Sequence, residues 1–86
     1  MALIAGTITS MTSWKETSDT LVKEFLFANF AEALAFVNKV GNVAEQQQHH
    51  PDIELSWGKV IVRLTTHDKG HVTDKDRTLA RAIDAL

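Results

Sequence analysis

The hydrophobic period of the chain changes at Pro51, and this change limits the possible folds more than any other feature. Over residues 30–48 the apolar residues recur every three or four positions, as on a helix. Over residues 53–65 apolar and polar residues alternate, as in half-buried strands. Proline disfavours helical geometry at the preceding residue. The His-His-Pro step at residues 49–51 is therefore predicted to join a helix to a strand.

The predicted helix has a clear start. Asn29 is a good N-cap, and Glu32 follows at the capping-box position. Gly41 costs about 1 kcal/mol relative to alanine, which close packing against a neighbour would explain. The apolar stripe on which the helix prediction rests comprises Phe30, Ala33, Leu34, Val37, Val40 and Ala44.

Two hairpins are predicted on either side of this helix. A turn near residues 57–59 separates two alternating runs, and His67 falls on the face away from the Val60, Val62 and Leu64 row. Upstream, residues 7–16 form a weak strand, and a turn at 17–19 leads to a second strand at 21–27.

A second helix follows Thr73, which acts as its cap, with Asp76 at the capping-box position. Its predicted buried stripe is Leu79, Ile83 and Leu86. The element order β-β-α-β-β-α predicts an α+β fold, a single four-stranded antiparallel sheet with helices packed on one face. Residues 1–86 are predicted to form one domain.

Composition excludes several classes of protein. The net charge is −2 and the nine Lys and Arg residues are scattered, so no basic stripe for nucleic acid exists. Cysteine is absent, which excludes disulfides and thiolate chemistry. The first residues lack a signal peptide and a membrane span, so we expect a cytoplasmic protein without membrane contact. Because 86 residues bury a thin core, we also expect a homo-oligomer, a dimer or tetramer.

Three of the four histidines lie at predicted element ends, where a scaffold can direct them to one point. Histidine is suited to proton transfer near neutral pH. His49 follows Glu45 by one helical turn and lies near a helix C-terminus, and both features favour its imidazolium form. His49 is thus a candidate proton donor.

Seven residues recur at a fixed spacing, namely Glu45, His49, His50, Pro51, Trp57, His67 and Asp76. Together they resemble the pattern of the pterin-4a-carbinolamine dehydratase family. The Trp14 position and the phenylalanines Phe25, Phe27 and Phe30 also look like that family, so the resemblance covers about residues 13–85. The phenylalanines are expected in the core.

The resemblance implies dehydration of a 4a-hydroxytetrahydropterin to the quinonoid dihydropterin, with no metal and no organic cofactor. It implies that His49 and His67 are the acid–base residues and that His50 binds and orients the pterin. A capping box alone explains Asp76. The further substrate-binding candidates are Gln48, Thr65, Thr66, Asp68, Trp14 and Asp76.

The chain departs from the family pattern in two places. Only thirteen residues precede Trp14, and they are predicted as strand, whereas family members carry an additional N-terminal helix there. Ser13 and His71 stand where the family usually has glycine. The resemblance implies that Trp14 supplies a flat apolar wall for the pterin ring. In the family, that wall of the pocket and the usual oligomer both depend on the additional helix.

Two other functions remain open at this stage. A metal site could use His49, His67 and His71 with Asp68, although no HExxH pairing is present. A protein-interaction module with little or no pterin turnover could use the Phe36, Val40 and Val43 side of the long helix, which could equally form the protein's own oligomer interface.

Overall fold

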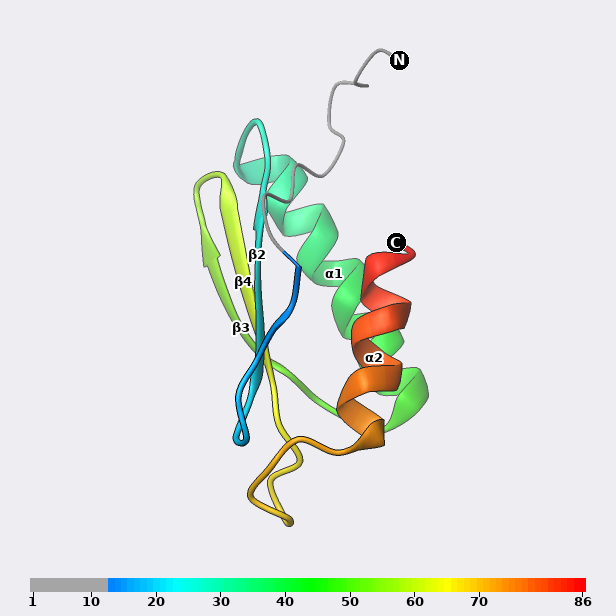
Figure 1. The fold of residues 1–86 in the computed structure, drawn as a ribbon. Helices are drawn as coiled ribbons and strands as arrows, with labels where there is room; N and C mark the ends of the chain where they lie inside the picture. The colour runs from blue at the N-terminus through cyan, green and yellow to red at the C-terminus, as the bar shows by residue number, and fades with distance from the viewer. Residues whose placement is uncertain (1–12) are drawn as a thin grey trace.

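In the computed structural model, residues 13–86 are described, and they form an α+β fold with the predicted element order. Figure 1 shows both helices on one side of a single sheet. The elements are β1 (Lys15–Glu16), β2 (Leu21–Leu26), α1 (Phe30–Gln47), β3 (Asp52–Ser56), β4 (Lys59–Leu64) and α2 (Asp74–Asp84).

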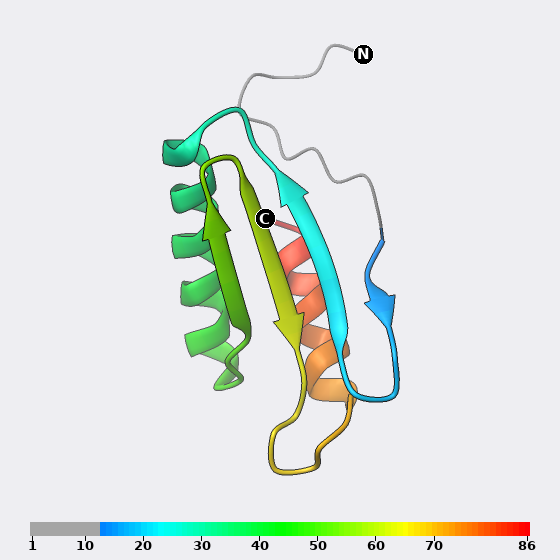
Figure 2. The ribbon, with the colours of Figure 1, turned by 90° about the vertical axis from the view of Figure 1, so that its left-hand side faces the viewer.

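The sheet has the strand order β1-β2-β4-β3, and every neighbouring pair is antiparallel. Figure 2 shows this sheet from the face that the helices do not cover. Both predicted hairpins are confirmed, since β1 pairs with β2 and β3 pairs with β4. Of the strand predicted at 7–16, the structure describes residues 13–16, and Lys15 and Glu16 of these form β1. Residues 7–12 lie outside the described residues, as does the region where the family helix would precede Trp14.

The core lies between the sheet and the two helices. Phe25 and Phe36 pack with ring centroids 4.7 Å apart and join β2 to α1. The opposite face of the sheet carries charged pairs such as Lys59–Glu24 and Arg63–Glu54. The fully buried large side chains are Phe25, Leu64, Leu79, Ile83, Val40, Val60, Val62 and Asp76.

The buried face of α1 agrees with the predicted stripe at Ala33, Val40 and Ala44 but differs from it elsewhere. Phe36 is buried, whereas Phe30 is 45% and Leu34 40% exposed. Both sets of apolar residues have helical spacing, and contact of Phe36 with Phe25 and Phe27 decides which set faces the sheet. The expectation that Phe30 lies in the core is therefore wrong. The buried residues of α1 are Ala33, Phe36, Val40 and Ala44.

Two further details correct the sequence analysis. Leu86 follows the end of α2 and is exposed, so the buried stripe of this helix holds Leu79 and Ile83 without it. A Cβ built on Gly41 would meet nothing within 4 Å among residues 13–86, so close packing within this part of the chain does not explain this glycine.

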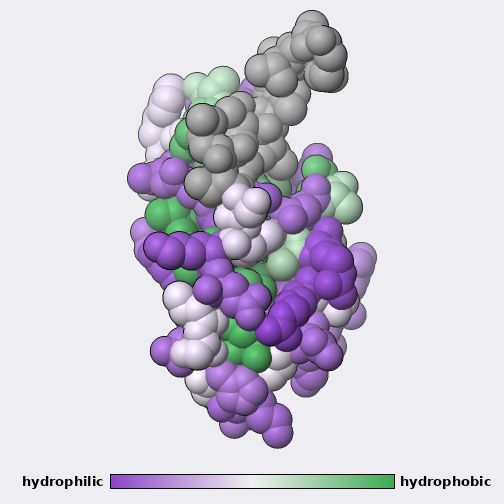
Figure 3. All heavy atoms as spheres, viewed as in Figure 1, coloured by the Kyte–Doolittle hydropathy of each residue, from purple (hydrophilic) through white to green (hydrophobic). Residues whose placement is uncertain are grey.

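The surface seen in Figure 3 is largely hydrophilic over α2, and hydrophobic side chains show only in small separated areas. Within residues 13–86, neither helix is long and apolar enough to cross a membrane.

Candidate active site

The candidate site begins where α1 ends. Gln48 takes a left-handed conformation (φ 52°, ψ 41°), and the next backbone N–H, that of His49, donates to the carbonyl of Ala44. This is the usual way in which a helix is closed by a left-handed residue. The chain then leaves the helix axis, so that His49 and His50 meet different partners.

His49 contacts a buried carboxylate on the other helix. Its Nε2 lies 2.5 Å from Oδ1 of Asp76, and the His49 side chain is 11% exposed whereas that of Asp76 is fully buried. Glu45, the carboxylate that the sequence suggested for His49, contacts Nε2 of His50 instead, in an exposed pair. The left-handed turn at Gln48 explains the change of partner, because residue 49 no longer continues the helical surface.

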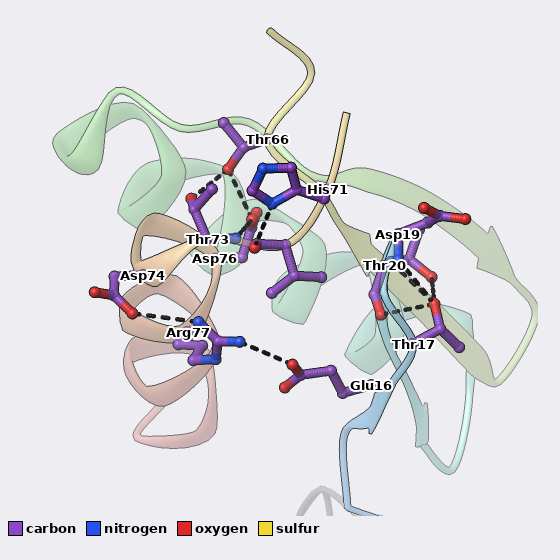
Figure 4. A network of polar contacts seen from close by, with 11 residues as sticks. Glu16, Thr17, Asp19, Thr20, Thr66, His71, Thr73, Asp74, Asp76 and Arg77 are labelled. Carbon is purple, nitrogen blue, oxygen red and sulfur yellow. Dashed lines mark hydrogen bonds and ion pairs between the residues drawn. The ribbon is translucent and has the colours of Figure 1, made fainter. Parts of the chain in front are cut away.

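Asp76 also holds the segments around it. The hydroxyl of Thr66 donates to its Oδ2 at 2.7 Å, and the backbone N–H of Thr73 donates to the same oxygen at 2.9 Å. The Thr73 hydroxyl in turn donates to Oγ1 of Thr66 at 2.6 Å. Figure 4 shows Thr66, Thr73 and Asp76 converging at the start of α2. Asp76 therefore caps α2, as predicted, and also fixes His49.

These contacts keep Asp76 ionised. Burial by itself raises the pKa of the Asp76 carboxyl, but hydrogen bonds from His49, the Thr73 backbone and the Thr66 hydroxyl, with the charge of His49, lower the pKa below its ordinary value of 3.8. An ionised carboxylate only accepts hydrogen bonds, so Nε2 of His49 must carry a proton. Nδ1 is then the ring nitrogen that can exchange a proton, and it has no hydrogen-bond partner among residues 13–86.

A pocket of about 400 Å³ lies beside this network. Three parts of the chain form it, namely residues 48–52, residues 66–68 and Lys75. It brings together His49, His50 and the exposed His67, the three histidines that the sequence analysis grouped. The site occupies the end of the molecule where α1 stops and α2 starts, at the bottom of Figure 1.

Other predicted site residues fall into two groups. Gln48, Thr66 and Asp68 line the pocket with the histidines, although the hydroxyl of Thr66 is engaged with Asp76 and Thr73. Thr65 is not among the lining residues, and Asp76 lies behind His49 rather than at the surface of the pocket.

Trp14 lies away from the pocket within the chain. Its Nε1 donates to the carboxylate of Asp84 at 3.0 Å, and its ring meets that of Phe25 edge-on at 6.1 Å. Asp84 ends α2, eight residues and about 12 Å along the helix from Asp76. The position of Trp14 does not support its expected place as a wall of the pocket.

Three lining residues were not predicted as site residues, namely Pro51, Asp52 and Lys75. Pro51 and Asp52 continue the histidine segment, so the segment itself was a signal for them. Lys75 precedes Asp76 in the first turn of α2. Its place in the pocket depends on how α2 packs beside the end of α1, which no local pattern indicates.

The alternative metal site does not form. Within residues 13–86, no group of three or more His, Cys, Asp or Glu side chains is arranged to hold a metal ion. His71, one of the suggested ligands, places Nδ1 2.9 Å from the carbonyl oxygen of Val72 and is not among the pocket residues.

The sequence is similar to those of known proteins over nearly its whole length. Residues 2–86 match the family model described as pterin 4 alpha carbinolamine dehydratase. A protein of Thermomicrobium roseum named "Putative pterin-4-alpha-carbinolamine dehydratase" is 42% identical over 85 residues, which are 99% of this chain and 91% of the relative. A protein of Sulfurisphaera tokodaii with the same name is 46% identical over 79 residues, covering 92% of this chain and 85% of the relative.

Two solved structures share the fold. The transcriptional coactivator/pterin dehydratase from Brucella melitensis has a TM-score of 0.79 at 29% identity, over 85% of this chain and 80% of that one. A pterin dehydratase-like protein described as a RuBisCO assembly factor in the alpha-carboxysome has a TM-score of 0.73 at 26% identity, over 87% and 89% of the two chains.

Proposed function

The chain belongs to the pterin 4 alpha carbinolamine dehydratase family, and we propose that it removes water from a 4a-hydroxytetrahydropterin to give the quinonoid dihydropterin. The reaction breaks the bond between C4a and its hydroxyl oxygen. A proton must reach the leaving hydroxyl, and a ring nitrogen must lose one. Two positioned imidazoles supply both steps near neutral pH, each for typically about 10²–10⁴-fold.

The observation that carries the proposal is the convergence of three histidines on one pocket, with His49 held by a buried, ionised Asp76. We assign the proton donor to His49. Its Nε2 proton is committed to Asp76, so Nδ1 is the atom that gives a proton to the leaving hydroxyl. The anionic Asp76 also balances the charge of the imidazolium form before this transfer.

We assign the base to His67. It lines the pocket from the loop after β4 and is exposed, so a proton taken from the pterin can pass to solvent. His50, Gln48 and Asp68 are assigned to binding and orientation of the pterin ring, since they line the same pocket. No cofactor and no metal takes part in this scheme.

The experiment compares the purified chain with three single histidine variants. We expect wild type to accelerate loss of a 4a-hydroxytetrahydropterin above the spontaneous rate, followed by absorbance. His49→Ala and His67→Ala should each lose about 10²-fold or more of kcat. His71→Ala is the matched control, because His71 lies outside the pocket, and it should retain wild-type activity. Absence of turnover by wild type, or full activity of His49→Ala, would contradict the proposal.

The second candidate is a protein-binding role with little turnover. One solved relative is described as a RuBisCO assembly factor, and another as a transcriptional coactivator/pterin dehydratase. In this chain Trp57 is 69% exposed, and Phe30 and Leu34 are also exposed, which favours some protein contact. The interface suggested by the sequence at Phe36, Val40 and Val43 is wrong, because Phe36 and Val40 are buried and Val43 packs partly buried against the core.

We propose that the contact is first of all with further copies of the chain, as a dimer or tetramer. The exposed residues Phe30, Leu34 and Trp57 support this, as does β3, which lies at an edge of the sheet. Light scattering of the purified protein tests it, and a strictly monomeric mass at micromolar concentration would contradict it.

A further inference from the structure

Thr66 lies between the proposed proton donor and the proposed base. It directly precedes His67 in the chain, and its hydroxyl donates to Oδ2 of Asp76 at 2.7 Å. The other oxygen of that carboxylate, Oδ1, contacts Nε2 of His49. One oxygen of Asp76 therefore holds the donor, and the other holds the segment that carries the base. Thr66 is the residue that joins these two sides of the pocket.

The main chain of Thr66 also closes the loop on which His67 lies. Its N–H donates to the carbonyl of His71 at 3.3 Å, and its carbonyl accepts from the N–H groups of Lys69 and Gly70 at 3.0 and 2.8 Å. The side chain of His67 is exposed, so its place at the pocket depends on this main chain rather than on packing around the ring. The bonds that hold Thr66 therefore also hold His67.

The hydroxyl of Thr66 is bonded to other groups of the chain. Thr66 is only 4% exposed, although it lines the pocket. Its hydroxyl proton is donated to Asp76, and its oxygen accepts from the Thr73 hydroxyl at 2.6 Å. A hydroxyl has one proton to donate, so Thr66 has none left for a ligand. Figure 4 shows its side chain turned toward Thr73 and Asp76 at the start of α2.

We infer that Thr66 is a positioning residue of the dehydration, which sets the distance between His49 and His67 through its bond to Asp76. This inference rests on the proposed function, because it takes His49 as the proton donor and His67 as the base. The reaction needs both imidazoles on one pterin ring, and a misplacement of about 1 Å can cost about 10²-fold in rate. The Thr66 hydroxyl thus acts on the rate as well as on stability.

The test compares Thr66→Val and Thr66→Ser with wild type in the pterin dehydration assay. Valine keeps the shape of threonine without the hydroxyl, and serine keeps the hydroxyl. Thr66→Val should lower kcat by about tenfold to 10²-fold and change KM by less than about twofold, whereas Thr66→Ser should stay within about threefold of the wild-type kcat. Thr66→Ala also lacks the hydroxyl and gives the same comparison if valine prevents folding. Thr65→Val is the matched control, because Thr65 does not line the pocket, and it should keep the wild-type kcat.

A double variant separates positioning from a direct contact with the substrate. In His67→Ala the base is absent, so the placement of its loop no longer affects the rate. Adding Thr66→Val to this variant should then lower the remaining kcat by less than about twofold. If Thr66 bound the pterin itself, the losses of the two single variants would multiply instead.

The outcomes distinguish the two proposals. Wild-type kcat in Thr66→Val, an equal loss in Thr66→Ser, a loss confined to KM, or multiplied losses in the double variant would each overturn the positioning role and leave the dehydratase function standing. Absence of turnover by wild type overturns the proposed function, and the positioning role with it.

Discussion

Three hydrogen-bond donors from separate segments meet at the carboxylate of Asp76. They come from His49 after α1, from Thr66 after β4, and from Thr73 before α2. A hydrogen bond to a charged group contributes about 1.5–3 kcal/mol, and the loss of a partner at a buried site is costly. At the scale of single residues, Asp76 therefore has two roles: it stabilises the fold, and it positions His49 for the proposed chemistry.

Asp76→Asn should separate these two roles. The asparagine oxygen can still accept from Thr66 and Thr73, but its NH₂ group would face Nε2 of His49. That nitrogen must then accept, which moves the ring proton to Nδ1 and leaves the wrong tautomer. We expect a folded protein with kcat lower by about 10²-fold or more. Imidazole ¹⁵N shifts report the tautomer, and an unchanged tautomer with unchanged turnover would refute the assigned role.

The sequence predicted the members of this site better than their contacts. The positions of His49, His50 and His67 at predicted element ends grouped these histidines, and the capping pattern identified Asp76. The sequence predicted Glu45 as the carboxylate beside His49, but His49 contacts Asp76 instead. Glu45 is close in sequence, whereas Asp76 lies 27 residues away. The left-handed turn at Gln48 decides between them, and glutamine is not a residue whose presence predicts such a turn.

At the scale of elements, α1 shows where a hydrophobic pattern stops being informative. Periodicity predicted the helix and three of its four buried residues, Ala33, Val40 and Ala44, but it missed Phe36 and wrongly included Phe30 and Leu34. Packing of Phe36 against Phe25 and Phe27 places Phe30 and Leu34 on the exposed side. The boundaries were easier to predict, since Asn29 caps α1 through its Oδ1 and the backbone N–H of Glu32.

Alanine substitution at two glycines should change the free energy of unfolding in opposite directions. A Cβ at Gly41 meets nothing within 4 Å among residues 13–86, so Gly41→Ala should stabilise the protein by up to about 1 kcal/mol through helix propensity. A Cβ at Gly58 would lie 2.8 Å from the carbonyl oxygen of Phe27, so Gly58→Ala should destabilise it by about 1–3 kcal/mol. Urea unfolding measures both. A destabilising Gly41→Ala would indicate that this side of α1 packs against another copy of the chain.

At the scale of the whole molecule, the site lies where the ends of three elements meet. α1 ends there, β4 runs into the 65–72 loop, and α2 begins, whereas the β3–β4 turn and the start of α1 lie at the other end (Figure 1). Local signals predicted the element order because each boundary has its own residues, such as Pro51 and Thr73. The pocket could not be predicted in the same way, since Lys75 reaches it only through the packing of α2 beside α1.

This arrangement makes the stability of the molecule sensitive to acid. The pKa of Asp76 is lowered in the folded state, so its ionised form stabilises the fold above its ordinary pKa of 3.8, and this contribution is lost as the pH falls through the lowered value. Asp76→Asn lacks this contribution at every pH. The free energy of unfolding of wild type should therefore exceed that of the variant by about 1–3 kcal/mol near pH 6, and by less near about pH 3, which lies below the ordinary pKa of 3.8.

Urea unfolding at the two pH values measures this difference, and Asp74→Asn provides the control. Asp74 lies two residues away on the same helix turn, but its side chain is 99% exposed. Its only bond to another side chain among residues 13–86 is the exposed contact with Arg77, so its replacement should change stability by less than about 0.5 kcal/mol at either pH. The difference in free energy of unfolding between wild type and Asp76→Asn could instead stay constant from pH 6 to pH 3. The ionised carboxylate would then not be the group that joins the two helices to the end of β4. The three segments would then be held by their apolar contacts alone, and His49 would owe its position to the turn at Gln48.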